Sequence, residues 1–294
     1  MKASQADNNN GIGRHLGQQS EYPEQYDPKL LVAIPRALNR SELGIGDALP
    51  FEGFDLWNAY EVSCLNDFGL PLSTVLRFKY SASSPDLVES KSLKLYLNSF
   101  NQEKLGADRA SALHKLIKTI QYDLEALLDT PIEIWVAGRV CQDPHRLEHY
   151  PLLECLHPNL AVSDYTANAA LLEIGNTPAK SLQVRSQLLR SRCRQTAQPD
   201  WGDIYLQMEG PEIPSTESLL RYIVSFRGEN HFHEEIVETI FKDIMCRFRP
   251  TQLLVLAQYT RRGGIDINPL RATHGHALLA PLSDLERFVP TLRQ

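Results

Sequence analysis

Alternating apolar and polar residues predict β-strands in two distant parts of the chain. A period of two matches an extended backbone, in which successive side chains point to opposite faces of a sheet. The apolar positions that share a face are Leu76, Phe78 and Tyr80 in the first segment, and Ile204, Leu206 and Met208 in the second. Both segments are therefore expected to be half-buried strands with one face toward a core.

Apolar residues at helical spacing follow each of these predicted strands. The first stripe contains Leu113, Leu116, Ile117, Ile120, Leu124 and Leu127, and the second contains Ile236, Val237, Ile240, Phe241, Ile244 and Phe248. Spacings of three and four residues place such side chains on one face of an α-helix. After each stripe a proline precedes another predicted strand, over residues 131–136 and 250–255.

Shorter sequence similarities occur in the same order in both halves. The matching segments are residues 96–100 with 222–226, and Thr119, Ile120 and Asp123 with Thr239, Ile240 and Asp243. We infer two related modules, each built from strands, a helix and further strands. The expected divisions are an N-terminal extension at 1–45, a first module at 46–155 and a second module at 156–294. Residues 1–20, which contain few apolar side chains, are expected to be loose.

Composition and charge narrow the class of protein. The chain has 294 residues, of which 43% are hydrophobic, and a net charge of −6, so long-range attraction to nucleic acid is not expected. No apolar run has the length of a signal peptide or of the roughly 20 residues of a membrane span. The cysteines are Cys64, Cys141, Cys155, Cys193 and Cys246. Their odd number and wide spacing predict reduced thiols and a cytoplasmic protein.

The segment from residue 89 to residue 102 combines an apolar stripe with a high density of polar groups. It begins with Glu89, Ser90, Lys91 and Ser92, and continues with a second lysine, a third serine and amide side chains. A solvated strand does not require such a run, whereas a surface that holds phosphates and a polar ring does.

Cys193 has a neighbourhood unlike that of the other cysteines. Arg190, Arg192 and Arg194 surround it in the sequence. Positive charge near a thiol favours the thiolate, which is the nucleophilic form. Asp200 follows seven residues later and suits a general acid or base. The alternative interpretation of Asp200, as a residue that caps the following turn, is equally well supported.

Histidines and carboxylates mark the expected start of the second helix. Asn230 is a natural N-cap, and the helix dipole favours Glu234 and Glu235 in a first turn. That structural interpretation does not explain His231 and His233. Histidine suits proton donation near neutral pH, and a buried glutamate suits a guanine-like edge that presents two N–H donors.

Arginines and glycines follow the last predicted strand. At Arg262-Gly263 the backbone can approach a phosphate while the guanidinium neutralises it, and the alternative is a hairpin turn with solvated arginines. A Rossmann domain is not expected, because the glycines of residues 11–17 have the wrong spacing. A metal site is not expected either, since the histidine pairs lack obvious third ligands.

In combination these motifs resemble the NADPH-dependent 7-cyano-7-deazaguanine reductases, the nitrile reductases of queuosine biosynthesis, in their long two-module form. The resemblance extends from about residue 16 to residue 271 and includes residues 26–31, 35–40, 49–51, 198–201, 220–227 and 259–264. It implies an α+β protein with tandem tunnelling-fold modules, in which antiparallel sheets backed by helices associate into barrels. It also implies a homodimer that binds neither nucleic acid nor membrane.

The same resemblance implies reduction of a nitrile to a primary amine by two NADPH. Cys193 would form a covalent thioimidate with the nitrile carbon, Asp200 would protonate the nitrogen, and His233 would be a proton source. The implied substrate-binding residues are Val88, Glu89, Ser90, Phe232, His233 and Glu234. The implied NADPH contacts are Ser90, Lys91, Arg262 and Gly263. Cys64, in the matching position of the first module, would be structural.

Two other functions stay open at this point. A cyclohydrolase-like enzyme that transforms pterins on the same fold would need metal ligands near the cysteine. A non-catalytic purine-binding protein would bind the deazapurine without forming a covalent adduct.

Overall fold

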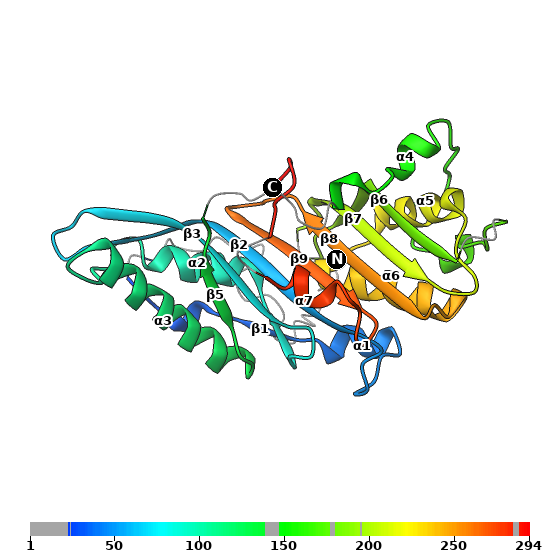
Figure 1. Ribbon diagram of the computed structural model, residues 1–294. Helices are drawn as coiled ribbons and strands as arrows, with labels where there is room; N and C mark the ends of the chain where they lie inside the picture. The colour runs from blue at the N-terminus through cyan, green and yellow to red at the C-terminus, as the bar shows by residue number, and fades with distance from the viewer. Residues whose placement is uncertain (1–22, 24, 139–146, 177–179, 195, 285–287) are drawn as a thin grey trace, which may run out of the picture.

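One antiparallel sheet runs through the centre of the molecule (Figure 1). The structure is a computed structural model and describes residues 23, 25–138, 147–176, 180–194, 196–284 and 288–294. Within that part, seven strands pair in the order β5-β3-β2-β9-β8-β7-β6. They are β2 (Glu52–Leu65), β3 (Pro71–Ser81), β5 (Glu133–Val136), β6 (Ser181–Arg192), β7 (Pro199–Glu209), β8 (Gln252–Tyr259) and β9 (Ile265–Ala272). A separate antiparallel pair joins β1 (Ala33–Pro35) to β4 (Asp86–Val88).

Helices cover this sheet in two matching groups. Those of the first half are α2 (Ser90–Ser99) and α3 (Arg109–Leu128), and those of the second half are α5 (Thr216–Ser225) and α6 (His233–Phe248). The shorter helices are α1 (Ala37–Glu42), α4 (Leu153–Leu156) and α7 (Leu279–Leu282). Single 3-10 turns occupy Pro28–Leu30, Leu147–His149, Ala169–Leu171 and Phe226–Gly228. Each half thus has a hairpin of long strands followed by a short and a long helix.

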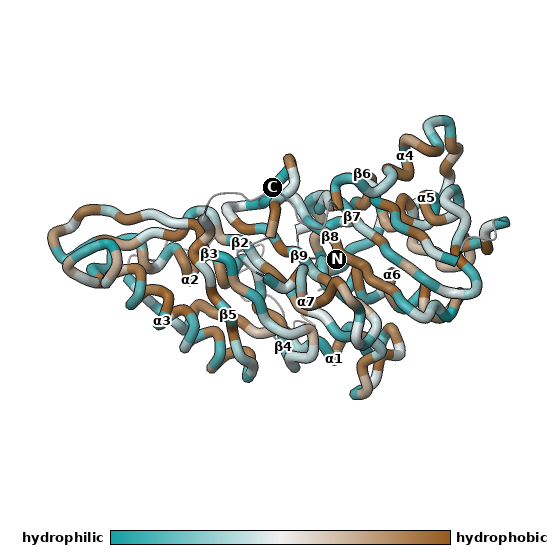
Figure 2. The backbone as a smooth tube through the Cα atoms, in the orientation of Figure 1, coloured by the Kyte–Doolittle hydropathy of each residue, from teal (hydrophilic) through white to brown (hydrophobic). Residues whose placement is uncertain are grey.

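The two faces of the sheet pack against different parts of the chain. On β2, Trp57 and Ala59 belong to the core under α2 and α3, whereas Phe54 and Leu56 belong to a second core on the opposite face. Leu279 of α7 and Phe288 pack on that opposite face. Since side chains alternate along a strand, one sequence serves both cores. Figure 2 shows hydrophobic and hydrophilic positions alternating along α3, whose apolar side faces the sheet.

The repeated sequence segments make the same contacts in both halves. The Tyr96 hydroxyl donates to Asp123 Oδ2 at 2.5 Å, and the Tyr222 hydroxyl donates to Asp243 Oδ2 at 2.6 Å. Each hydrogen bond ties the short helix to the long helix of its half. The edge-to-face ring pairs are Tyr96 with Phe100 and Tyr222 with Phe226, at centroid distances of 5.3 and 5.2 Å.

The strand and helix predictions of the repeat are confirmed, as is the α+β class. The short helices α2 and α5 are additional, because the predicted module held one helix. In α2, polar side chains on Ser90, Lys91 and Ser92 interrupt the apolar stripe that identifies a helix. The divisions at residues 45 and 155 stay predictions. Residues 1–20, the glycines of 11–17 and Cys141 lie outside the described residues.

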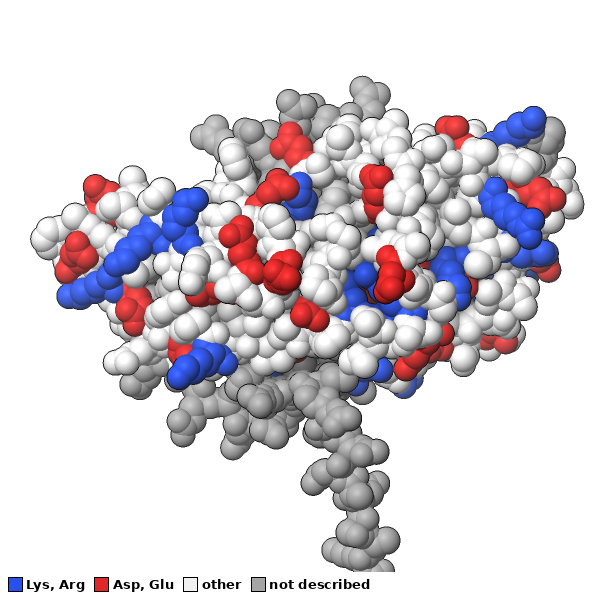
Figure 3. All heavy atoms as spheres, turned by 90° about the horizontal axis from the view of Figure 1, so that it is seen from below, with Lys and Arg blue, Asp and Glu red and all other residues white. Residues whose placement is uncertain are grey.

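The described surface mixes both signs of charge. On the face drawn in Figure 3, lysine and arginine side chains are interspersed with aspartate and glutamate. Over the described part of the chain, no helix combines the length and the apolarity needed to cross a membrane.

Candidate functional site

A tight turn between β6 and β7 places Cys193 next to Asp200. The Cys193 N–H donates to the Gln198 carbonyl at 2.8 Å, and the Ala197 N–H donates to the Cys193 carbonyl at 2.9 Å. Ala197 has a φ of 55°, a left-handed conformation that non-glycine residues adopt rarely. Asp200 then pairs with Ser191 across the hairpin, so its backbone lies in the ladder. The turn brings the thiol and the carboxyl to the same end of the sheet.

The segment before α6 crosses this end of the hairpin. The Arg192 N–H donates to the Glu229 carbonyl at 2.8 Å, and the His231 N–H donates to the Arg192 carbonyl at 3.2 Å. These bonds hold Phe232, His233 and Glu234 beside Cys193. The prediction that Asn230 caps the helix is wrong, because the N-cap is Phe232, without a side-chain cap. Asn230 instead bridges to Arg192, and this strand-like pairing delays the start of the helix.

The hairpin between β8 and β9 supplies a cation to the carboxyl. Gly263 and Gly264 have φ values of 61° and 82°, which glycine tolerates in a tight turn. Arg262 Nη1 lies 3.0 Å from Asp200 Oδ1, and His233 Nε2 lies 3.5 Å from Asp200 Oδ2. The predicted hairpin turn is therefore present, and its arginine contacts the site.

An aromatic contact fixes the histidine ring. His233 stacks on Tyr259 of β8 with a centroid distance of 3.8 Å and an interplanar angle of 14°. Burial raises the pKa of the Tyr259 hydroxyl well above its ordinary value, and the nearby Asp200 and Glu234 raise it further. The hydroxyl stays neutral at physiological pH, so Tyr259 acts as a packing surface and adds no charge.

The first half of the chain supplies the opposite wall of the same site. β4 brings Leu87 and Val88 to it, and the first residue of α2 brings Ser90. Glu89 lies between them and is 1% exposed. Its carboxylate accepts the N–H groups of Lys91 and Ser92 at 3.0 and 2.7 Å, so Glu89 is the N-cap of α2. Glu89 therefore fixes the helix start that carries Ser90.

A small cavity lies between these elements. Its lining is Trp57, Leu87, Val88, Ser90, Cys193, Asp200, His231, Phe232, His233, Glu234, Arg262 and Ile267. The free volume is about 20 Å³, which is room for roughly one water molecule. Residues from both halves of the chain line it.

Glu234 is a buried carboxyl group in the wall of this cavity. Its side chain is buried, and its Oε1 has no hydrogen-bond partner among the described residues. Burial and, to a smaller extent, Asp55 raise the pKa of Glu234, whereas His233 and Arg36 oppose the shift, and the resulting pKa is about 7. A buried acceptor without a partner is costly in a folded protein. Such an atom at a cavity wall is suited to binding a ligand donor.

The arginines near Cys193 have other partners. Arg194 Nη1 bonds Asn39 Oδ1 at 2.5 Å and Glu235 Oε1 at 3.2 Å. Arg190 Nη1 donates to the Arg227 carbonyl at 2.5 Å. Because these guanidinium groups are engaged elsewhere, Arg262 is the arginine that lines the cavity together with the thiol.

Eight of the predicted catalytic, substrate-binding and NADPH-binding residues meet at this cavity. They are Val88, Ser90, Cys193, Asp200, Phe232, His233, Glu234 and Arg262. Glu89, Lys91 and Gly263 adjoin lining residues in the sequence and are not among the lining themselves. The lining residues that the predicted set lacks include Trp57, Leu87 and Ile267, whose apolar alternation resembles any core strand. His231 could have been predicted as a lining residue, because it lies two residues from His233.

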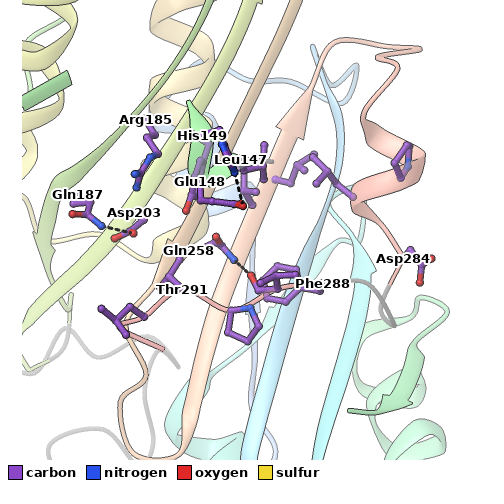
Figure 4. A pocket seen from close by; sticks show the side chains of 18 of the residues that line it. Leu147, Glu148, His149, Arg185, Gln187, Asp203, Gln258, Asp284, Phe288 and Thr291 are labelled. Carbon is purple, nitrogen blue, oxygen red and sulfur yellow. Dashed lines mark hydrogen bonds and ion pairs between the residues drawn. The ribbon is translucent and has the colours of Figure 1, made fainter. Parts of the chain in front are cut away.

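A larger cavity lies on the opposite face of the sheet, between the strands and the C-terminal segment (Figure 4). Its volume is about 750 Å³. Asp203 at its wall contacts Gln187 and Arg293, and Gln258 donates to the Val289 carbonyl. None of the predicted site residues lines it. Over the described residues, no group of three or more His, Cys, Asp or Glu side chains is arranged to hold a metal ion.

Two family models match separate segments of the chain. Residues 22–136 match the family described as "Nitrile reductase, 7-cyano-7-deazaguanine-reductase N-term", and residues 199–277 match the family described as "QueF-like protein". The first match ends with β5 and the second begins at β7. Residues of both matched segments line the small cavity.

Full-length relatives are also similar. The NADPH-dependent 7-cyano-7-deazaguanine reductase of Chromohalobacter salexigens is 43% identical over 91% of this chain and 94% of that protein. The proteins of the same name from Aromatoleum aromaticum and Dechloromonas aromatica are 44% and 45% identical, each over 89% of this chain and over 90% and 91% of their own lengths. A solved apo archaeosine synthase QueF-Like matches with a TM-score of 0.30 and 16% identity, over 34% of this chain and 98% of that chain.

Proposed function

Because the chain belongs to the family of NADPH-dependent 7-cyano-7-deazaguanine reductases, we propose that the cavity between its two halves is the site of nitrile reduction. The protein is an NADPH-dependent oxidoreductase that converts the nitrile of 7-cyano-7-deazaguanine to an aminomethyl group, a reaction of queuosine biosynthesis. The two family segments follow one another along one sheet, as tandem tunnelling-fold modules. The observation that carries the proposal is the meeting of Cys193, Asp200, His233 and Glu234 at one cavity.

Cys193 is the proposed nucleophile. Its side chain is 8% exposed and lines the cavity, so the sulfur can reach a bound nitrile while bulk water is largely excluded. The new S–C bond converts the nitrile to a thioimidate, and the thiol proton moves to the nitrile nitrogen, directly or through Asp200. Covalent attachment divides one difficult reduction into easier steps.

Asp200 and His233 are the proposed proton-transfer pair. The carboxylate contacts both the imidazole at 3.5 Å and Arg262 at 3.0 Å. The first hydride would reduce the thioimidate carbon, and the C–S bond would then break to give the imine and the free Cys193 thiol. The second hydride would reduce the imine to the amine, and one proton accompanies each hydride, so a donor at this position is used twice. Since His233 is fixed by stacking on Tyr259, its proton stays directed at Asp200 between steps. General acid catalysis of this kind typically contributes about 10²- to 10⁴-fold.

Glu234 is the proposed receptor of the purine-like edge. An ionised carboxylate accepts two hydrogen bonds from the ring N–H and the exocyclic amine of the base. The burial of Glu234 at the cavity wall and its unpaired Oε1 support this role. The free volume of about 20 Å³ is far smaller than a bicyclic base. Binding of the base therefore requires the cavity to widen.

The cations at one edge of the site suit NADPH. A Cβ atom placed on Gly263 would lie 2.6 Å from Lys94 Nζ, so the Lys94 side chain of α2 approaches the hairpin that carries Arg262. Together with Lys91 on the first turn of α2, these groups form a donor set for phosphates. NADPH, when bound, supplies the hydride for each of the two reduction steps. Arg262 would hold a phosphate and keep Asp200 oriented.

The assembly and location of the protein are further proposals. We expect a cytoplasmic homodimer that acts on a free base and binds neither nucleic acid nor membrane. The net charge of −6 and the mixed charges on the face in Figure 3 support the absence of nucleic-acid binding. Equilibrium sedimentation of the full chain tests the dimer directly.

Stoichiometry tests the function itself. Purified protein is mixed with 7-cyano-7-deazaguanine and NADPH, and the NADPH oxidised is compared with the amine formed. The proposal requires two NADPH for each amine. Base that binds without NADPH oxidation would favour a purine-binding protein, and metal-dependent conversion of a pterin would favour a cyclohydrolase-like enzyme.

A further inference from the structure

A group of buried charges lies directly behind the candidate site. It consists of Arg36, Arg40, Asp55, Glu238 and Arg271, none of which is more than 7% exposed. Asp55 bonds Arg36 at 2.5 Å and Arg271 at 2.8 Å. Glu238 bonds Arg271 at 2.8 Å and Arg40 at 2.7 Å. Buried charges persist only when they are paired, and this group has three cations for two anions.

When Glu234 is ionised, its carboxylate adds a third anion, so the charges of the three arginines are matched. It lies one helical turn before Glu238 on α6, so both carboxylates lie on the same face of the helix. Arg36 and Asp55 both act on the charge of Glu234. The group is therefore electrostatically coupled to the residue that receives the substrate, although it does not line the cavity.

Arg36 also supports the wall of the cavity that faces α6. Its Nε donates to Ser84 Oγ at 3.1 Å, and its backbone N–H donates to the Pro85 carbonyl at 3.0 Å. Its guanidinium lies over the ring of Tyr80, whose hydroxyl accepts the Val88 N–H at 3.4 Å. These contacts surround β4, the strand whose Leu87 and Val88 line the cavity.

We propose that Arg36 is a positioning residue of the nitrile-reduction site, which holds the β4 wall in place and balances the charge of Glu234. The proposal rests on the function proposed above. It explains why an arginine of the N-terminal segment is buried against Asp55 of β2 and Tyr80 of β3 without lining the cavity. A guanidinium is suited to this role because its fork contacts Ser84 and Asp55 at once.

The pH dependence of base binding follows from the groups around Glu234. They are Asp55 on β2, Tyr80 on β3, Tyr259 on β8, His233 on α6 and Arg36. Burial and Asp55 favour the protonated acid, whereas His233 and Arg36 favour the carboxylate. Because the carboxylate binds the base, loss of Arg36 should move the onset of binding to higher pH.

The test compares Arg36→Met and Arg36→Lys with Arg40→Met as the matched control. Arg40 is equally buried and comes from the same segment, yet it bonds Glu238 and the Ala82 carbonyl, away from β4. The KM for 7-cyano-7-deazaguanine, kcat and melting temperature are measured from pH 6 to pH 9. Arg36→Met should raise the KM about tenfold or more at pH 7, with a smaller change in kcat, and should shift the pH midpoint upward.

The other two variants separate positioning from stability. Arg36→Lys should keep the pH midpoint and raise the KM severalfold, because it retains the charge and loses the fork. Arg40→Met should lower the melting temperature and change the KM and the pH midpoint less than Arg36→Met does, because Arg40 bonds Glu238 and, among the described residues, makes no contact with β4. If Arg36→Met does not fold, the KM of Arg36→Lys becomes the deciding measurement. A KM equal to that of the wild type overturns the proposal. Equal shifts in Arg36→Met and Arg40→Met also overturn it. Wild-type protein that reduces no nitrile contradicts the proposed function instead.

Discussion

The hairpins β2–β3 and β6–β7 occupy the same place in the two halves, and they end differently. Both contain a register shift, after Ala59 in β2 and after Ser186 in β6. Cys64 at the end of β2 is fully buried in the core under α2 and α3, where burial raises the pKa of its thiol. Cys193 after β6 faces the cavity.

The turns explain this difference. After Cys64, the Asn66 side chain accepts the N–H groups of Phe68 and Leu70 and closes a local turn. After Cys193 the turn instead leads directly to Asp200, and the segment before α6 pairs with Arg192. The two hairpins thus share a scaffold. The difference between their cysteines depends on the chain segment that packs across the end of each hairpin.

The two halves also differ in which helix N-terminus reaches the cavity. In the first half it is the short helix α2 whose start reaches the cavity, whereas α3 begins with a capping box between Asp108 and Ser111. In the second half the long helix α6 reaches the cavity, and α5 begins with a Ser215 cap. A duplicated fold can therefore build one asymmetric site from two similar halves.

We expect the largest effect on kcat from replacing Cys193 with alanine, and Cys64→Ala is the matched control. Cys193→Ala should lower kcat at least about a thousandfold, because it removes the nucleophile. Cys64→Ala should cost about 1 kcal/mol of stability and leave kcat near the wild-type value. NADPH oxidation under saturating base measures both, and equal losses in the two variants would remove the distinction between the halves.

Asp200→Asn should slow reduction by about 10²- to 10⁴-fold with little change in base affinity, because it removes a proton donor. The control is Asp203→Asn, three residues along the same strand, whose carboxylate contacts Gln187 and Arg293 on the other face of the sheet. Asp203→Asn should keep wild-type kcat. If kcat and affinity of Asp200→Asn both stay near wild type, Asp200 is a turn residue only.

Base affinity should fall as the pH decreases through about 7. The pKa of Glu234 is raised to about 7 by burial, so the accepting carboxylate is present above that pH and is lost below it. Glu234→Gln should weaken binding by about 10- to 100-fold and remove this dependence. Calorimetric titration of the base from pH 6 to pH 8 measures both, and a flat wild-type profile would exclude Glu234 as the receptor.

The smallest effects should come from the shared helix contacts. Tyr222→Phe removes the bond to Asp243 and should cost about 1–3 kcal/mol of unfolding free energy. Tyr96→Phe should cost less, because Asp123 also accepts the Tyr26 hydroxyl at 2.7 Å. Urea unfolding compares the two variants, and a larger loss for Tyr96→Phe would contradict this account of the scaffold.

Periodicity sufficed to predict the scaffold. The stripes of α3 and α6 and the alternation of β3 and β7 follow from one buried face each, which the sequence displays directly. The helix α2 was harder to predict, since it begins with the polar residues Ser90, Lys91 and Ser92. The continuous sheet was harder still, because the pairing of β2 with β9 joins residues more than two hundred positions apart.

The site was predictable only through the resemblance of its motifs. Cys193 and Asp200 are seven residues apart, so one turn brings them together. Nothing local indicates that Val88 and Ser90 face them, because that contact depends on the β1–β4 pair. The sequence does not indicate the coupling of Glu234 to Arg36 either. An arginine is usually exposed, and only the structure shows that Arg36 is buried.

The most direct measurement is the position of a covalent adduct. Wild type, Cys193→Ala and Cys64→Ala are each incubated with 7-cyano-7-deazaguanine without NADPH, and the intact masses and modified peptides are determined. The account predicts an adduct on the peptide that contains Cys193 in wild type and in Cys64→Ala, and no adduct in Cys193→Ala. An adduct that persists in Cys193→Ala, or that maps to Cys64, would contradict the assignment of the chemistry to the second hairpin.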